Sequence, residues 1–270
     1  MRNKKISVIT LTWNSESTVA DTIKSIQKQS YDNYEHIIID NESTDKTLDL
    51  IRDLYSNDNN KLKIISEKDK GISDAFNKGI KNSTGDIVVF LNSDDMYESH
   101  NVFEEVMNAF SDSDVMYVHG DMIFEDDLYG TNRRKPLLCS LEEAMPYNHP
   151  TFFVRRELYE KHGVFDLKYK YTMDFHFICR LYKTPVEPRY KSKYISKIPF
   201  VRMRAGGVSW KYEFESLSEL ENALKEYGFF TKRAMTFINN RKLRVKVRKI
   251  ITGLRLNFFV TLWRKWKWRS

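Results

Sequence analysis

This chain has few cysteines and contains no long apolar runs. Its 270 residues include two cysteines, Cys139 and Cys179, which form neither a disulfide framework nor the paired spacing of a zinc site. We read them as reduced thiols of a cytosolic protein, since the amino end shows no signal peptide. No segment approaches the roughly 18 uninterrupted apolar residues of a transmembrane helix, so the chain is not expected to span a membrane.

The glycine-rich motifs that hold phosphates in many nucleotide-binding proteins are also absent. No Gly-x-Gly-x-x-Gly follows the first predicted strand, and no Gly-x-x-x-x-Gly-Lys-Ser/Thr occurs anywhere in the chain. Neither a dinucleotide-binding fold nor a phosphate loop is therefore supported. Any phosphate group has to be held by other residues.

Acidic residues are missing from the last part of the chain. Residues 229–270 contain 13 Lys or Arg and no Asp or Glu, so a chain of net charge +7 has a body of net charge −6. This basic tail indicates an anionic partner, either nucleic acid or phospholipid headgroups. Its cations alternate with large apolar residues, including Trp263, Trp266 and Trp268, a mixture typical of a membrane interface. We therefore favour lipid contact over a helix packed on the body.

Strand and helix patterns alternate in the first half of the chain. Apolar runs predict strands at 6–11, 35–40, 62–66 and 87–91, with helices at 17–29, 46–55 and 73–81. Such repeated units indicate an α/β fold with a mostly parallel sheet buried on both faces. The length and the 41% hydrophobic composition suffice for one large domain with an extension.

Two adjacent carboxylates, Asp94 and Asp95, follow the fourth predicted strand. Ligands of open α/β sheets bind beyond the carboxyl ends of strands, so chemistry is expected here. Carboxylates suit Mg²⁺ or Mn²⁺, which would neutralise a diphosphate that bare acids repel. A solvated turn is an equal alternative for this segment, because Asp favours turns. Asp40 ends another strand, where it can bond a base or ribose or cap the next helix.

Four ordered segments resemble one protein family. They are 6–14 (ISVITLTWN), 37–45 (IIIDNESTD), 67–79 (EKDKGISDAFNKG) and 85–95 (GDIVVFLNSDD). Together they are similar to the family 2 glycosyltransferases, closest to bacterial enzymes that build O-antigen, capsule or exopolysaccharide. The resemblance implies the GT-A fold of nucleotide-diphospho-sugar transferases, a Rossmann-like, mostly parallel sheet flanked by helices. We expect this domain over 1–210 and a helical, basic, amphipathic extension over 211–270.

The resemblance also implies a nucleotide-sugar donor, most often a UDP-sugar. The residues implied to bind it are Leu11, Trp13, Asp40, Asp69, Lys70, Gly71, Ser93 and Asp94. Among these, Trp13 supplies a flat wall of the nucleoside pocket and Asp40 bonds the base. Asp95 is implied to hold Mn²⁺ or Mg²⁺. Asn92, which brings no charge, stands where the family often has a further Asp.

Asp174 matches the position of the acid that inverting members of the family use as a base. That acid deprotonates the acceptor hydroxyl during its attack. A helix-start carboxylate that only caps its helix is the alternative for Asp174. His149 is expected as a pocket residue, and Arg204 belongs to a loop, 202–210, that could close over the diphosphate or form a plain turn.

These residues predict a metal-dependent inverting hexosyltransferase of bacterial surface-polysaccharide biosynthesis. Its acceptor is expected to be a glycan or a polyprenol-linked glycan. The protein is expected in the cytoplasm, where residues 229–270 would bind it to the inner face of the plasma membrane. A nucleic-acid-binding protein that works through the basic tail is one alternative, although strand-end acids would repel a polyanion. A GT-A-like nucleotidyltransferase is another, but the glycine-rich, basic amino-terminal signature of such enzymes is missing.

Overall fold

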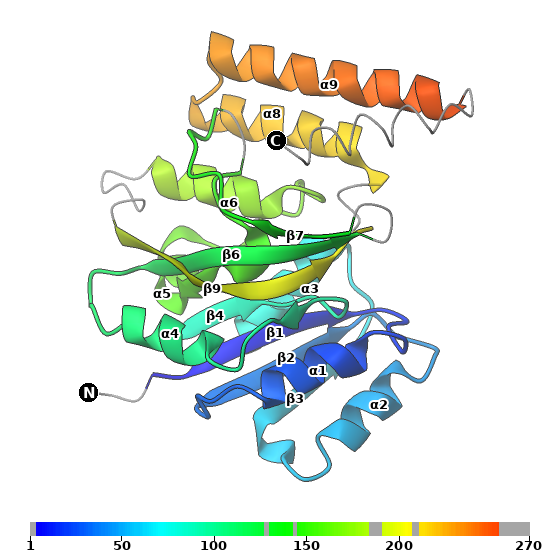
Figure 1. Ribbon diagram of the computed structural model, residues 1–270, viewed down its shortest axis with the longest axis vertical. Coiled ribbons are helices and arrows are strands. Elements are labelled where there is room, and N and C mark those ends of the chain that lie inside the picture. Colours follow the sequence, from blue (N-terminus) through cyan, green and yellow to red (C-terminus); the bar gives the residue numbers. More distant parts are fainter. Residues whose placement is uncertain (1–3, 127–129, 143–144, 184–190, 207–210, 254–270) are drawn as a thin grey trace.

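A single mixed sheet forms the centre of the computed structural model, which describes residues 4–126, 130–142, 145–183, 191–206 and 211–253 (Figure 1). Its strands are β1 (Ile6–Thr12), β2 (Tyr34–Asp40), β3 (Leu62–Ser66), β4 (Ile87–Phe90), β5 (Met96–Tyr97), β6 (Tyr117–Asp126), β7 (Gly130–Arg134), β8 (Phe153–Arg155) and β9 (Ser192–Arg204). They lie in the order β3-β2-β1-β4-β8-β6-β9-β5, with β7 paired to β6.

Helices cover this sheet on both faces. They are α1 (Val19–Gln27), α2 (Thr47–Leu54), α3 (Ile72–Asn82), α4 (Val102–Ala109), α5 (Arg156–His162), α6 (Met173–Tyr182), α8 (Glu213–Tyr227) and α9 (Lys232–Gly253), with short 3₁₀ turns at Asn59–Lys61 and His149–Thr151. The latter turn is η2. The strands and helices predicted for the first half of the chain are confirmed, with bounds that shift by one or two residues.

The expected mostly parallel sheet is confirmed, because the pairs among β1 to β4 and the long pair β6-β9 are parallel. β1 pairs in parallel with β2 and β4, and β2 pairs in parallel with β3. The second half adds the antiparallel pairs β4-β8, β6-β8, β6-β7 and β5-β9. The connection between β6 and β7 is too short for the crossover that a parallel pair needs, so these strands must run antiparallel.

Alternate residues of the central strands enter different cores, which explains why apolar residues occur on both faces of these strands. Ile9 and Val88 belong to one cluster, together with apolar residues of α3, α6 and α8. Val8 and Val89 point to a second cluster, which includes residues of α4. Because side chains alternate along a strand, a strand buried on both faces has no polar side.

The carboxyl-terminal helices form successive layers above the sheet (Figure 1). Leu220 and Leu224 of α8 share a core cluster with α6, and Ala234 and Ile238 of α9 join the same cluster. Both helices therefore pack on the body rather than forming a core of their own. Within the described parts of the chain, no helix has the length and apolar character needed to cross a bilayer. The three tryptophans predicted to contact lipid lie outside the described residues.

Two buried histidines should make stability depend on pH. His36 lies between the Thr10 hydroxyl (2.9 Å) and the Tyr55 hydroxyl (2.7 Å). Burial lowers the pKa of His36 to about 3 and that of His119 to about 4. The unfolded chain, with an ordinary histidine pKa of about 6.5, therefore binds more protons below that pH, and stability falls as the pH falls.

Between pH 6.5 and 5 we expect the free energy of unfolding to fall by about 1 to 2 kcal/mol for each of these histidines. Urea unfolding at both pH values measures this change. His36→Gln should remove roughly half of the pH dependence that the two histidines cause. An equal pH dependence of the unfolding free energy in the wild type and in His36→Gln would contradict this account.

Candidate active site

The carboxyl end of β4 positions Asp94 and Asp95. After the strand, the Asp95 backbone N–H donates to the Asn92 carbonyl (3.1 Å), which turns the chain back. The Thr22 hydroxyl of α1 donates to the Asp95 carbonyl (2.7 Å) and fixes the turn against a helix. As a result, the Asp95 side chain is buried, with 2% exposure, whereas Asp94 is half-buried.

The two carboxylates lack sufficient positive charge around them. Burial and the neighbouring Asp94 charge hold the pKa of Asp95 well above its ordinary value, and burial also raises the pKa of Asp94. Arg204 opposes both shifts, through its charge and, for Asp95, through a backbone hydrogen bond. One arginine thus compensates the two acids only in part.

Arg204 ends β9 beside these acids, while Arg202 on the same strand has other partners. The Arg204 guanidinium donates to the exposed Asp21 of α1 (2.9 Å). Arg202 instead forms a bidentate pair with Glu98 (2.8 and 2.9 Å). The loop predicted at 202–210 begins later than expected, because residues 202–204 belong to β9. Residues 207–210 lie outside the described residues, and among the residues described Arg204 faces the carboxylates.

Trp13 and Leu11 lie at the carboxyl end of β1, next to β4. The Trp13 side chain is 66% exposed, which is unusual for tryptophan, while Leu11 packs on the core. The Ser93 and Ser15 hydroxyls lie 2.9 Å apart and join the loops that follow the two strands. An exposed aromatic face thus lies near Asp94, as a nucleoside pocket requires.

Asp40 ends β2 with both carboxylate oxygens engaged. Oδ1 accepts from the hydroxyls of Thr12 (2.9 Å) and Ser43 (2.5 Å). Oδ2 accepts from the Ser43 backbone N–H (2.9 Å) and the Ser66 hydroxyl (2.7 Å). These four bonds fill the acceptor capacity of a carboxylate and tie together the ends of β1, β2 and β3. A base could be bound by Asp40 only by replacing one of these donors, so this role stays a prediction.

The segment Asp69-Lys70-Gly71 forms a tight turn before α3. The Gly71 N–H donates to Oδ1 of Asp69 (2.8 Å), and Gly71 adopts a φ of 112°, which favours glycine. The Asp69 N–H donates to the Asn41 side chain (3.0 Å), which places the turn beside the end of β2. The Lys70 side chain is exposed at this edge and could reach a phosphate.

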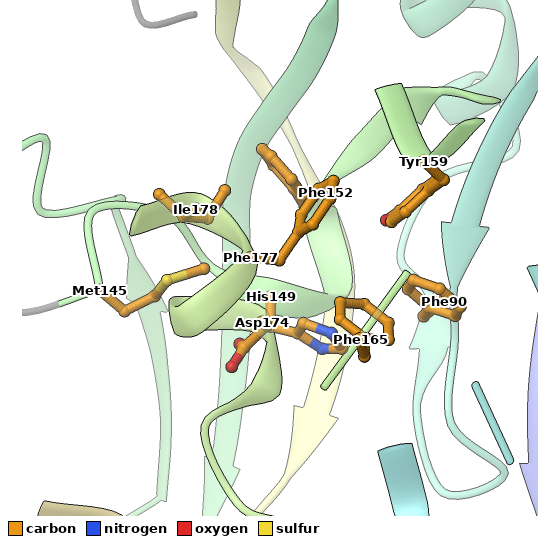
Figure 2. Close-up of a pocket in the computed structure, with 9 residues that line it drawn as sticks. All are labelled: Phe90, Met145, His149, Phe152, Tyr159, Phe165, Asp174, Phe177 and Ile178. Atoms are coloured by element: carbon orange, nitrogen blue, oxygen red, sulfur yellow. The ribbon is translucent and has the colours of Figure 1, made fainter. Parts of the chain in front are cut away.

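Asp174 and His149 line one small cavity at the same end of the sheet (Figure 2). The cavity encloses about 10 Å³, room for about one water molecule, and Phe90, the last residue of β4, forms part of its wall. The His149 ring stacks parallel to that of Phe90, with centroids 6.0 Å apart. Figure 2 shows the Asp174 carboxylate pointing away from the rings of Phe90 and Phe165. A sugar would therefore meet this carboxylate outside the cavity.

Comparison with known proteins identifies the family. The family model for glycosyl transferase family 2 matches residues 7–185. The chain belongs to this family. An uncharacterized glycosyltransferase of Nostoc sp. (strain PCC 7120) is 34% identical over 125 residues, which are 46% of this chain and 38% of the relative.

Solved structures share the architecture at low identity. The 1–349 fragment of S. aureus TarS in complex with UDP-GlcNAc has a TM-score of 0.65 at 20% identity and covers 82% of this chain and 66% of that one. The mannosyltransferase PcManGT from Pyrobaculum calidifontis, in complex with GDP-Man and Mn²⁺, has a TM-score of 0.66 at 16% identity, with 88% and 69% covered. The fold is therefore the GT-A fold that the resemblance implied.

A divalent cation fits the acids of this family 2 chain. In the ranges that the structure describes, no three side chains of His, Cys, Asp and Glu converge on one metal position. Mg²⁺ and Mn²⁺ do not need three, because water and substrate phosphates complete their coordination. Asp94 and Asp95 offer hard oxygen ligands. Burial raises the pKa of both, and the Asp94 charge adds to the shift at Asp95, so their charged forms are disfavoured in a way that a bound cation would offset.

Glu219 of α8 holds the start of the helix that carries Asp174, and no sequence pattern indicates this role. Its carboxylate accepts the backbone N–H groups of Lys170 (2.9 Å), Tyr171 (2.8 Å) and Thr172 (3.0 Å). These bonds satisfy donors before the first turn of α6. Asp21, the partner of Arg204, was missed in the same way. Both are charged helix residues whose partners lie far away in sequence, so only covariation among homologues could have shown them.

Proposed function

We propose that the chain is a metal-dependent inverting glycosyltransferase that uses a UDP-sugar. The observation that carries this proposal is the edge where the parallel strands end. Trp13, Asp94 and Asp95 lie there after β1 and β4, and Asp174 lines a cavity walled by the last residue of β4. UDP-GlcNAc bound to TarS and Mn²⁺ bound to PcManGT support the donor class and the metal.

Each residue then has one task. Trp13 stacks on the base, and Lys70 and Arg204 approach the diphosphate. Asp174 takes the proton of the acceptor hydroxyl while its oxygen bonds the anomeric carbon from the face opposite the diphosphate. The bond from that carbon to the phosphate oxygen breaks, and UDP leaves with the electron pair. When bound at Asp95 and Asp94, the cation supplies charge stabilisation for this leaving group.

The acceptor that we propose is a lipid-linked glycan of a bacterial surface polysaccharide. The protein would act at the cytoplasmic face of the plasma membrane, with residues 1–210 as the transferase domain and 211–270 as its extension. Family membership favours sugar transfer over nucleotidyl transfer. The experiment is nucleotide release from a panel of UDP-sugars and GDP-sugars, with Mn²⁺ and a bacterial lipid extract. UDP release that needs both lipid and metal supports the proposal, and release of GDP alone from GDP-sugars would overturn the donor class.

Trp13→Ala should weaken UDP binding about tenfold or more, because a base stacked on an aromatic side chain gains about 1 to 3 kcal/mol. Because the Trp13 side chain is exposed, the free energy of unfolding should change by less than about 0.5 kcal/mol. Titration calorimetry with UDP and Mn²⁺ measures the binding. Trp13→Phe, which keeps a flat ring, is the matched control and should bind UDP nearly as well as the wild type. Equal affinity of the Ala variant would remove Trp13 from the nucleoside pocket.

A further inference from the structure

Helix α9 carries apolar residues on two opposite faces. Ala234 and Ile238 are buried against the body. Leu243, Val247 and Ile250, spaced by four and three residues, are 60%, 46% and 62% exposed. At about 100° per residue, these three side chains share one face, and that face points away from the buried one. We call these three residues the outward face of α9.

The cations of α9 divide in the same way. On the inner side, Lys242 pairs with Glu221 of α8 (2.6 Å) and Arg248 pairs with Glu213. Beside the outward face, Lys232 and Arg244 are exposed, and the helix contains no Asp or Glu. Contact with α8 therefore engages part of the positive charge and leaves the cations around the outward face directed to solvent.

We propose that the outward face of α9 rests on a bilayer that contains anionic lipid. Its aliphatic side chains would enter the boundary between headgroups and acyl chains, while the flanking cations meet lipid phosphates. This proposal extends the proposed function, and the biological meaning of the membrane contact rests on that function. The contact itself does not depend on sugar transfer.

Charge complementarity favours lipid over the other occupants of this face. A second copy placed face to face would bring the exposed cations of both helices together, with no acid on either helix to pair them. Nucleic acid would satisfy the cations but leave Leu243, Val247 and Ile250 without apolar contact. An anionic bilayer satisfies both the cations and the aliphatic side chains.

This surface would place the two substrate sites at different depths from the membrane. Helix α8 joins the layers, because Glu213 and Glu221 bind α9 while Glu219 holds the start of α6 and thus Asp174. In Figure 1, α9 lies at one end of the molecule and β1 to β3 lie toward the other. Asp174, the proposed general base for the acceptor, is thus closer to the proposed membrane face than the nucleoside pocket is.

The test is flotation of the full chain with two kinds of vesicle. We expect binding to vesicles of phosphatidylglycerol and phosphatidylcholine, and at least about tenfold weaker binding to phosphatidylcholine alone. The triple variant L243Q/V247Q/I250Q keeps the charge and the helix propensity, and should lose about tenfold or more in partitioning. The matched control V164Q/L167Q changes two exposed apolar residues outside α9 and should float like the wild type.

Thermal unfolding of both variants shows whether each is folded, since the substituted side chains are exposed. The proposal is overturned if the folded triple variant floats like the wild type, which would leave lipid contact to other parts of the chain. Equal binding to neutral vesicles also overturns it. The proposal is also overturned if the wild type forms a dimer, or retains DNA in a salt-dependent way, and the triple variant abolishes that property. A protein that floats as predicted but releases no UDP would contradict the proposed function and leave this surface supported.

Discussion

Replacing Asp95 with Asn is expected to lower kcat/KM by about a thousandfold or more without unfolding the protein. The buried carboxylate is the metal ligand that we propose, and its charge cannot be replaced by an amide. The amide oxygen can still accept the backbone N–H of Arg204 that the carboxylate accepts. Steady-state kinetics with Mn²⁺ and a UDP-sugar measure the loss.

Stability separates this effect from misfolding. Because burial and Asp94 raise the pKa of Asp95, the charged carboxylate is unfavourable in the metal-free fold, and Asn should leave the melting temperature equal or higher. Asp53→Asn, which changes an exposed acid of α2, is the control and should keep full activity. Wild-type turnover of Asp95→Asn would remove Asp95 from the mechanism.

Asp174→Asn is expected to lower kcat by about a hundredfold to ten-thousandfold while leaving UDP binding intact. The amide cannot take the acceptor proton, which is the contribution of a general base. The side chain is half-buried and bonds only the adjacent Phe175 N–H (2.8 Å) in the hydrogen bonds described, so Asn should preserve the fold. Turnover with acceptor and calorimetry with UDP, on the same preparation, measure both properties.

The two variants should therefore differ in kind. Asp95→Asn should lose both metal-dependent UDP binding and turnover, whereas Asp174→Asn should lose turnover alone. If Asp174→Asn bound UDP as poorly as Asp95→Asn, Asp174 would belong to the donor site. If it turned over like the wild type, the base would be another residue.

The sequence alone predicts the half of the fold that repeats a simple unit. Strands buried on both faces are continuous apolar runs, such as the three isoleucines before Asp40, so their positions and ends can be read directly. The acids that follow them then fall at one edge of the sheet. The second half has short strands such as β5 and β8, whose pairing depends on long-range contacts that no local pattern encodes.

Side-chain partners in the candidate site were the least predictable part. A strand-end acid such as Asp40 is visible in the sequence, but its saturation by Thr12, Ser43 and Ser66 depends on how three strands align. Glu219 reaches Tyr171 across 48 residues of sequence, from a helix predicted only as part of a basic extension. Local periodicity carries no information about such pairs.

The central claim is that UDP and a divalent cation bind together at Asp95. Titration calorimetry of UDP into the wild type and Asp95→Asn, each with Mn²⁺ and with a chelator, tests it most directly. The account predicts that Mn²⁺ strengthens UDP binding to the wild type by about tenfold or more, and that Asp95→Asn loses this gain. Equal UDP affinity with and without Mn²⁺, or the same gain in Asp95→Asn, would contradict it.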